Sequence, residues 1–222
     1  MRTSARTIVL PLGIATLLAG AASLAQSPGA ANQPGKPAPG ALTELRVDAK
    51  TSRLTVETET VGLSSLFGHD HKFYARDLTG KISLAPGRPE SAALELTARA
   101  DALTLVEDVS DDTHREIDAA IREVVLEAEK YPQITFRSRS VTAKKNDDGS
   151  FEVKMAGDLD LHGVRRKITI PARVTETPEG IRATGAIELR QSDFKIKPFT
   201  FAKGTVKVRD VVALSFDVVG KR

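Results

Sequence analysis

The stretch VKMAGDLDL, residues 153–161, indicates the fold because its apolar and small side chains recur at every second position. The first set is Val153, Met155, Gly157, Leu159 and Leu161, and the set that alternates with it includes Lys154, Asp158 and Asp160. A period of two is the signature of a β-strand. One apolar and one polar face is typical of antiparallel sheets. The stretch therefore predicts an antiparallel strand with one buried face.

The same period recurs along the chain from residue 45 onward. It is found at 54–56, 78–84, 92–100, 181–189 and 206–218. Turn-forming residues separate these runs at 85–87, 146–149 and 177–180. Short strands joined by such turns favour an all-β protein, either a meander closed into a barrel or a sandwich.

One segment has helical spacing instead. Thr113 and Glu116 have the spacing of a capping box, with the threonine at the helix N-cap. The apolar face that follows is Ile117, Ala120, Ile121, Val124, Val125 and Ala128. Tyr131-Pro132 would end the helix. We expect one amphipathic helix of about 14 residues lying across an open end or a flank of the barrel.

The N-terminus has the pattern of an export signal. Residues 1–25 combine two arginines, an apolar run and a small-x-Ala motif, which predicts a cleaved signal peptide and a periplasmic or secreted protein. An uncleaved anchor is the alternative, and cleavage would leave no stable membrane span. Residues 26–42 are rich in Pro, Gly and Ala and predict a flexible linker. The folded domain is expected at 43–222.

Charge and cysteine content exclude several kinds of protein. The chain carries a net charge of +3, and removing Arg2 and Arg6 with the signal peptide leaves +1, which argues against a nucleic-acid partner. The absence of cysteine excludes disulfides, thiol nucleophiles and thiolate metal sites. No cofactor is predicted.

The heptapeptide FGHDHKF, residues 67–73, contains two of the four histidines. On a strand His69 and His71 would point the same way, and His162 could supply a third metal ligand. This spacing alone is a weak metal signal, and no G-x-S-x-G motif supports a catalytic serine. We interpret the segment as a loop at the barrel mouth, with contact to a ligand headgroup as the second reading.

Small residues occupy many inward positions, which leaves two possibilities. An eight-stranded barrel is just wide enough to be filled by side chains or to hold one small ligand. Small inward residues are compatible with a ligand cavity, and equally with a solid core in which small and large residues alternate. From the residues alone the choice stays open.

Several motifs resemble the YceI-like family of bacterial polyisoprenoid-binding proteins. The most specific is REIDAAIREVVLEAEKYPQITFRS (115–138), where the family has a helix running into a Y-P-x-I-x-F-x-S strand. GDLDLHGVRRKITIPARV (157–174) is similar to the family hairpin G-x-L-x-L-H-G-V-x-R-x-V. QSDFKIKPF (191–199) resembles S-D-F-G-I, with Lys195 in place of the usual glycine. LSSLFGHDHKF (63–73) is similar to an early loop in one branch.

The resemblance implies an extended, eight-stranded antiparallel β-barrel that is lipocalin-like and holds an isoprenoid chain in an apolar tunnel. It implies an exported lipid-binding protein, not an enzyme, whose ligand is an isoprenoid quinone, a polyprenyl phosphate or a similar long-chain amphiphile. A homodimer is possible in such a family. The alternatives are a metal-binding or enzymatic barrel using His69, His71 and His162, and a partner-binding barrel with a filled core.

On this reading, two groups of residues form the candidate site. The apolar wall is expected to include Val56, Phe67, Leu94, Leu96, Phe136, Leu159, Leu161, Ile168, Ile170, Ile187, Phe194, Phe199 and Phe216. The candidate headgroup contacts are His69, His71, Arg165, Arg166, Lys195 and Lys197. The basic residues among them could pair with a pyrophosphate if they lie at one open end.

Overall fold

The computed structural model describes residues 42–62, 70–75, 77–201 and 206–222. The predicted signal peptide and nearly all of the predicted linker lie outside these residues, as do Phe67 and His69. Within the described ranges, no helix has the length and apolar character needed to cross a membrane.

Strands make up most of the described chain, and the helical segments are short. The strands are β1 (Thr43–Val47), β2 (Arg53–Gly62), β3 (His71–Ala75), β4 (Thr79–Ala85), β5 (Arg88–Arg99), β6 (Leu103–Leu105), β7 (Gln133–Lys145), β8 (Phe151–Leu161), β9 (Val164–Thr177), β10 (Gly180–Arg190), β11 (Thr200–Phe201) and β12 (Val206–Lys221). The helical segments are η1 (Ala100–Ala102), α1 (Asp111–Ala120), the π-helical turn η2 (Ile121–Val125) and η3 (Gln191–Phe194).

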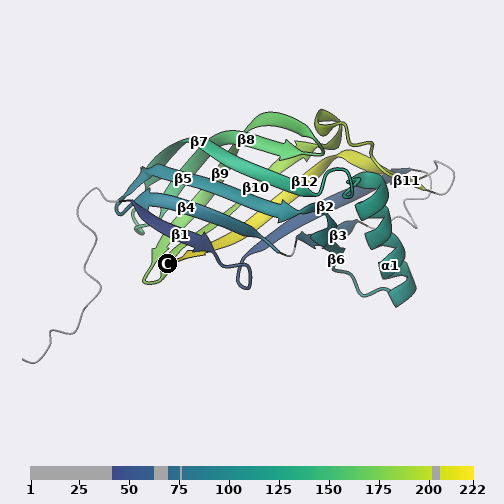
Figure 1. Cartoon of the computed structure of the whole chain (residues 1–222), viewed down its shortest axis with the longest axis horizontal. Helices are drawn as coiled ribbons and strands as arrows, with labels where there is room; N and C mark the ends of the chain where they lie inside the picture. Colours follow the sequence, from purple (N-terminus) through teal and green to yellow (C-terminus); the bar gives the residue numbers. More distant parts are fainter. Residues whose placement is uncertain (1–41, 63–69, 76, 202–205) are drawn as a thin grey trace, which may run out of the picture. The chain divides into compact units, whose positions relative to one another are not determined.

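Eight of the strands form a closed antiparallel ring (Figure 1). Their order is β1-β4-β5-β7-β8-β9-β10-β12, and β12 pairs back with β1. The structure thus confirms the predicted all-β fold with one helix, and decides for the barrel over the sandwich.

Strand β12 pairs with two strands in series along one of its edges. Its C-terminal residues Gly220 and Lys221 pair with β1, whereas Val206–Asp217 pair with β2. Strands β1 and β2 lie on the same edge of β12. Strand β10 pairs with the other edge, over residues 211–221 of β12. Strand β2 in turn pairs with β3, and β3 with β6. These three strands form a branch outside the ring.

The predicted turns connect the strands as expected. Pro86-Gly87 joins β4 to β5, residues 146–150 join β7 to β8, and residues 178–179 join β9 to β10. The loop between β8 and β9 has only two residues, His162 at φ 51° and Gly163 at φ 71°. Two successive positive φ values match the tight hairpin turn that suits the twist of antiparallel strands.

The helix begins earlier than predicted, so the capping box starting at Thr113 was wrong. Ser110 is the N-cap, and its Oγ accepts a hydrogen bond from the backbone N–H of Thr113 at 3.3 Å. Asp111 and Asp112 in the first turn add favourable interactions with the helix dipole. Serine three residues before Thr113 offers the same capping chemistry, which is why the start was misplaced.

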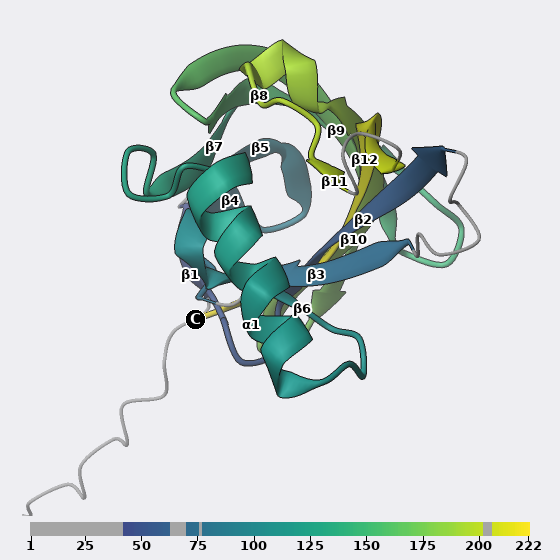
Figure 2. The ribbon, with the colours of Figure 1, turned by 90° about the vertical axis from the view of Figure 1, so that its right-hand side faces the viewer.

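The end of the helix also differs from the prediction. The α-helix gives way to the π-turn η2, which ends at Val125, several residues before Tyr131-Pro132. Val124 was expected on the apolar face but is 64% exposed. A π-turn inserts an extra residue per turn, so residues after it leave the regular helical stripe. Figure 2 shows α1 lying across one end of the barrel, as predicted.

Candidate functional site: a tunnel in the barrel

The barrel encloses a cavity of about 580 Å³. Its lining comes from β2 to β10, from α1, η2 and η3, and from β12. Every predicted wall residue within the described ranges contributes: Val56, Leu94, Leu96, Phe136, Leu159, Leu161, Ile168, Ile170, Ile187, Phe194, Phe199 and Phe216. Phe67 lies outside the described residues. That these side chains contact a ligand remains a prediction.

Glycines beside two aromatic rings help to keep the barrel hollow. A Cβ placed on Gly185 would lie 2.5 Å from Cζ of Phe216, its register partner on β12. A Cβ on Gly157 would lie 2.7 Å from Cζ of Phe136 on the neighbouring strand β7. Each phenylalanine therefore occupies the space above a glycine backbone. The rings rest against the sheet because no side chain stands beneath them.

The short helix η3 places Phe194 in the cavity lining, where the residue is only 2% exposed. Hydrogen bonds hold η3 to β12. Gln191 Nε2 donates to the Arg209 carbonyl oxygen at 2.8 Å, and the Ser192 backbone N–H donates to Asp210 Oδ1 at 2.8 Å. The Ser192 hydroxyl also donates to Asp210, and these bonds lower the pKa of that carboxyl below its usual value.

The departure from the family motif falls on the residue that ends η3. Lys195 has φ 60°, in the left-handed region. Glycine adopts this conformation freely, whereas another residue is disfavoured by roughly 1–2 kcal/mol. The geometry explains why a glycine suits this position, and the lysine side chain is exposed to solvent.

The cavity is polar at one end only. Its polar lining residues are Thr58, His71, Arg99, Glu116, Arg190 and Gln191. They lie where strands β2, β3, β5 and β10 reach the end of the barrel that α1 covers. At the opposite end the lining is apolar and includes Ile82, Leu84, Val174 and Ile181. The lining therefore changes from polar at one end to apolar at the other, which matches the headgroup and tail of an amphiphile.

His71 lies on a strand and not in the loop that we expected, because its backbone pairs with Thr58 of β2. Its Nδ1 lies 2.8 Å from Glu107 Oε2, and Glu107 Oε1 accepts from the Lys72 backbone N–H at 3.1 Å. Glu107 lies after β6, just before the helix. His71 lines the cavity, so contact with a headgroup remains a prediction for this residue.

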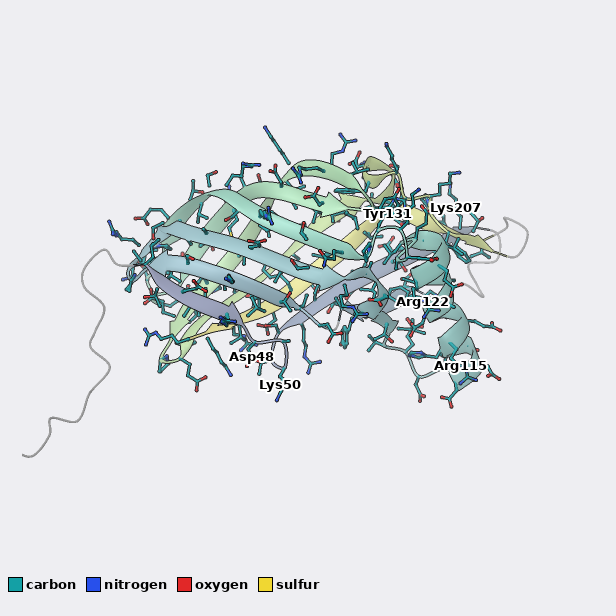
Figure 3. The ribbon with its side chains drawn as sticks, viewed as in Figure 1. Asp48, Lys50, Arg115, Arg122, Tyr131 and Lys207 are labelled. Carbon is teal, nitrogen blue, oxygen red and sulfur yellow. The ribbon has the colours of Figure 1, made fainter. Side chains whose placement is uncertain are left out.

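His162 is buried in a structural contact. Its Nε2 lies 2.7 Å from Glu127 Oε2, its Nδ1 lies 3.2 Å from the Phe194 carbonyl oxygen, and its ring centroid lies 4.4 Å from that of Tyr131. Figure 3 shows Tyr131 at the barrel end near α1. Both ring nitrogens thus have protein partners, which removes His162 as the third metal ligand. Among the described residues, no group of three His, Cys, Asp or Glu side chains could hold a metal ion.

The four basic residues predicted to contact the headgroup do not line the cavity. Arg165 Nε donates to Asp160 Oδ1 at 2.9 Å, and this bond raises the pKa of Arg165 above its usual value. Arg166 Nε donates to the Asp193 carbonyl oxygen at 3.0 Å. Lys195 and Lys197 are exposed to solvent. Any role for these residues is at the rim, outside the tunnel.

Sequence reasoning missed most of the polar lining. Thr58 could have been found, because it continues the inward alternation of Leu54 and Val56. Arg99, Arg190 and Gln191 lie at strand ends, where alternation no longer reports which way a side chain points.

A hollow antiparallel barrel with an amphipathic helix across its polar end belongs to the lipocalin-like class of barrels. The chain itself is a member of the YceI-like domain family, whose family model matches residues 45–220. This agrees with the resemblance seen in its motifs.

Curated relatives support the assignment. The chain is 34% identical over 99 residues to the UPF0312 protein of Pseudomonas fluorescens (44% of this chain, 46% of the relative). It is 38% identical over 96 residues to protein YceI of Escherichia coli O157:H7 (39% and 47%). The chain thus spans about half the length of these two relatives. A UPF0312 protein of Vibrio cholerae is 31% identical over 160 residues (68% and 76%).

Solved structures share the fold. A polyisoprenoid binding domain from Saccharophagus degradans, implicated in plant cell wall breakdown, superposes with a TM-score of 0.59 at 14% identity, covering 82% of this chain and 99% of that one. BcnA of Burkholderia cenocepacia gives 0.58 at 17% identity, covering 78% and 98%. At such identities the likeness shows the fold alone.

Proposed function

We propose that this protein is exported and holds a polyisoprenoid, either an isoprenoid quinone or a polyprenyl phosphate, or a similar long-chain amphiphile, in its tunnel. The observation that carries the proposal is the cavity of about 580 Å³ with an almost wholly apolar lining. Family membership and the fold shared with a polyisoprenoid binding domain support a lipid ligand. Export rests on the sequence pattern of residues 1–25.

The energetics of such a ligand suit an apolar tunnel. Burial of one methylene group contributes about 0.8 kcal/mol, so a five-carbon isoprene unit contributes roughly 3–4 kcal/mol before costs. Association costs an estimated 4–15 kcal/mol. Several buried units are therefore needed for useful affinity, and a tunnel that encloses a long tail can bind well with few contacts to the headgroup.

The polarity of the lining sets the orientation of the ligand. The headgroup would lie at the end covered by α1, near Thr58, His71 and Arg190, with the tail directed to the opposite end. The exposed basic residues at the rim could then attract an anionic headgroup as it approaches.

We propose binding without catalysis. Two of the polar lining residues make structural contacts: His71 with Glu107, and Gln191 with the Arg209 carbonyl oxygen. The alternative of a metal or enzymatic site on His69, His71 and His162 is not proposed, because His162 is occupied by Glu127 and Phe194.

The test is to extract purified, natively expressed protein with organic solvent and to identify the released compounds by mass spectrometry. Ala183→Phe places a ring in the tunnel, because Ala183 lines it, whereas Ala213→Phe adds the same ring on the exposed face of the adjacent strand β12. We expect a prenyl or acyl compound from wild type and from A213F, and little from A183F. Recovery of no such compound from wild type, or equal recovery from both variants, would reject the proposal.

A further inference from the structure

The wall of the tunnel changes its construction between strands β9 and β10. Within residues 164–190, all of which the structure describes, these two strands pair with each other only over 173–177 and 180–184. Toward the α1 end, β9 stays paired with β8 as far as its first residue, and β10 stays paired with β12 as far as its last. The helix η3, which follows β10, contacts both β9 and β10. The chain after β10 therefore bridges the two strands where their own pairing has ended, and we call residues 191–197 the bridging segment.

The bridging segment presents one kind of side chain to the tunnel and another to solvent. Phe194 and Ile196 are 2% and 4% exposed, and both line the cavity. Lys195 and Lys197, which alternate with them, are exposed. Figure 2 looks onto the α1 end of the barrel and shows η3, in yellow-green, at the rim. The two lysines thus lie on the outer side of a short piece of the tunnel wall.

Lys195 keeps a strained backbone without an internal contact for its side chain. Its φ is 60°, and the family motif has glycine at this position, which adopts that conformation freely. In the part of the chain that the structure describes, the Lys195 side chain forms no ion pair and no hydrogen bond. Strain that is retained at an exposed residue with no internal partner points to a role outside the fold.

Two residues of β9 extend the positive charge. Arg166 and Lys167 are exposed, and Arg166 Nε donates to the Asp193 carbonyl oxygen of η3 at 3.0 Å, which places the guanidinium beside the bridging segment. Lys167 lies opposite Asp158 on β8, but the Asp158 carboxylate already accepts a hydrogen bond from Arg139 Nε at 2.7 Å. We call the following four residues the basic patch: Arg166, Lys167, Lys195 and Lys197.

The basic patch carries a local excess of positive charge. The neighbouring carboxylates of Asp158, Asp160 and Asp210 already face arginines outside the patch. Asp193 and Glu188 form no ion pair with any described residue. Four cations against these two carboxylates leave an excess of +2, whereas the whole mature chain is expected to carry only +1. The positive charge of the protein is therefore concentrated beside the bridging segment.

The placement of the basic patch indicates what it binds. None of its four residues lines the tunnel, so their charges face solvent and not an enclosed ligand. Cations on an open surface suit the diffuse negative charge of a bilayer, to which each nearby Lys or Arg adds a similar attraction. A long-chain amphiphile partitions into such a bilayer because its tail avoids water.

We propose that the basic patch docks this protein on the anionic surface of a lipid bilayer, with the bridging segment turned toward the membrane. The inference goes beyond the proposed function, because it concerns the outer surface and holds whatever the tunnel carries.

The experiment measures co-sedimentation of the full-length mature protein with vesicles of phosphatidylcholine alone, or of phosphatidylcholine mixed with anionic phosphatidylglycerol. Salt is set at about 0.1 M and at about 1 M, where the Debye length falls from about 10 Å to about 3 Å. The double variant Lys195→Gly/Lys197→Gln removes two charges from the patch and relieves the strain at residue 195. The matched control is Lys144→Gln/Lys154→Gln, because it removes two exposed lysines of β7 and β8 near the opposite end of the barrel.

We expect wild type to bind only the vesicles that contain phosphatidylglycerol, and to be released by the higher salt. Each charge lost from the patch should weaken binding roughly fivefold, so the patch variant should bind roughly 20-fold more weakly, with unchanged or higher stability to urea. The control variant should bind like wild type. Ala183→Phe, which obstructs the tunnel, should also bind like wild type.

Four results would overturn the inference. These are equal binding to neutral and anionic vesicles, equal weakening in the two double variants, loss of binding in A183F, and release by inorganic phosphate but not by sulfate at the same ionic strength. The last result would make the patch a site for small phosphate groups. Absence of vesicle binding would also overturn it, and extraction of a prenyl or acyl compound from the same protein would leave the proposed function standing.

Discussion

Replacing Gly185 with alanine should drive the Phe216 ring into the tunnel. The new Cβ would lie 2.3 Å from the Pro171 carbonyl oxygen and 2.5 Å from Phe216 Cζ. Both distances are far inside van der Waals contact, so one neighbour must move. The carbonyl belongs to β9, which is paired with β8 at this point, whereas the ring lines the cavity and can rotate toward it. A ring displaced there would take up part of the cavity of about 580 Å³.

The same structure gives the cost in stability. Overpacking a core costs about 1–3 kcal/mol, and loss of glycine's conformational freedom returns about 0.5–1 kcal/mol. Since the Pro171 oxygen cannot retreat easily, we expect Gly185→Ala to lower the free energy of unfolding by about 1–2 kcal/mol. Urea denaturation measures the change in the free energy of unfolding. Displacement of a fluorescent prenyl analogue from the purified protein measures the loss of binding.

Two further variants separate the ring contact from other effects. In a Phe216→Leu background, Gly185→Ala should cost less by about 0.5 kcal/mol or more, because part of the clash is gone. Gly149→Ala is the control: no atom lies within 4 Å of its Cβ, but φ is +83°, so stability should fall without loss of binding. Unchanged binding in G185A, or no relief from F216L, would refute our explanation of the hollow core.

Three other perturbations test the rim and the closure of the barrel. A hydrogen bond from Lys221 lowers the pKa of Asp48 from 3.8 to about 2, so the stability that this pair adds is present above pH 3.8 and is lost as pH falls through about 2. Lys221→Met should therefore lower the urea midpoint at neutral pH, with the difference from wild type vanishing near pH 2; a constant difference would contradict this. Ser110→Ala should cost about 0.5–2 kcal/mol of helix stability and speed amide exchange in α1 but not in β8, and equal exchange would argue against the cap. His162→Asn keeps a residue that tolerates positive φ but loses the contact with Glu127, so we expect destabilisation by about 1–3 kcal/mol in thermal melts, and an unchanged Tm would exclude this role.

Strand alternation predicted the inner face of the barrel well, because a period of two is dictated by the backbone itself. Val153, Met155 and Leu159 all face inward and line the cavity, as their spacing indicates. Whether that face enclosed a space could not be read from spacing. It depends on close contacts between strands, such as Phe216 over Gly185, and the residues of such a pair lie far apart in sequence.

Local chemistry was less decisive for the helix and the histidines. Ser110 and Thr113 are both good N-cap residues by type, so residue type alone could not choose between them, and the structure has Ser110 at the cap. His162 was grouped with His71 by residue type. The fold instead places His162 against Glu127 and Tyr131. These two residues belong to the long segment between β6 and β7, whereas His162 follows β8. Contacts between side chains that are far apart in sequence depend on how the strands are connected, and no local sequence pattern indicates them.

The double pairing of β12 has a consequence for the wall of the tunnel. Near its C-terminus the strand meets β1 and the ring closes through eight strands; farther back, the same edge meets β2, which brings β3 and β6 with it. At the α1 end the cavity wall therefore includes β2, β3 and β6, whereas at the opposite end β12 meets β1 directly. The two neighbours of a single strand thus make the two ends of the cavity wall different in composition.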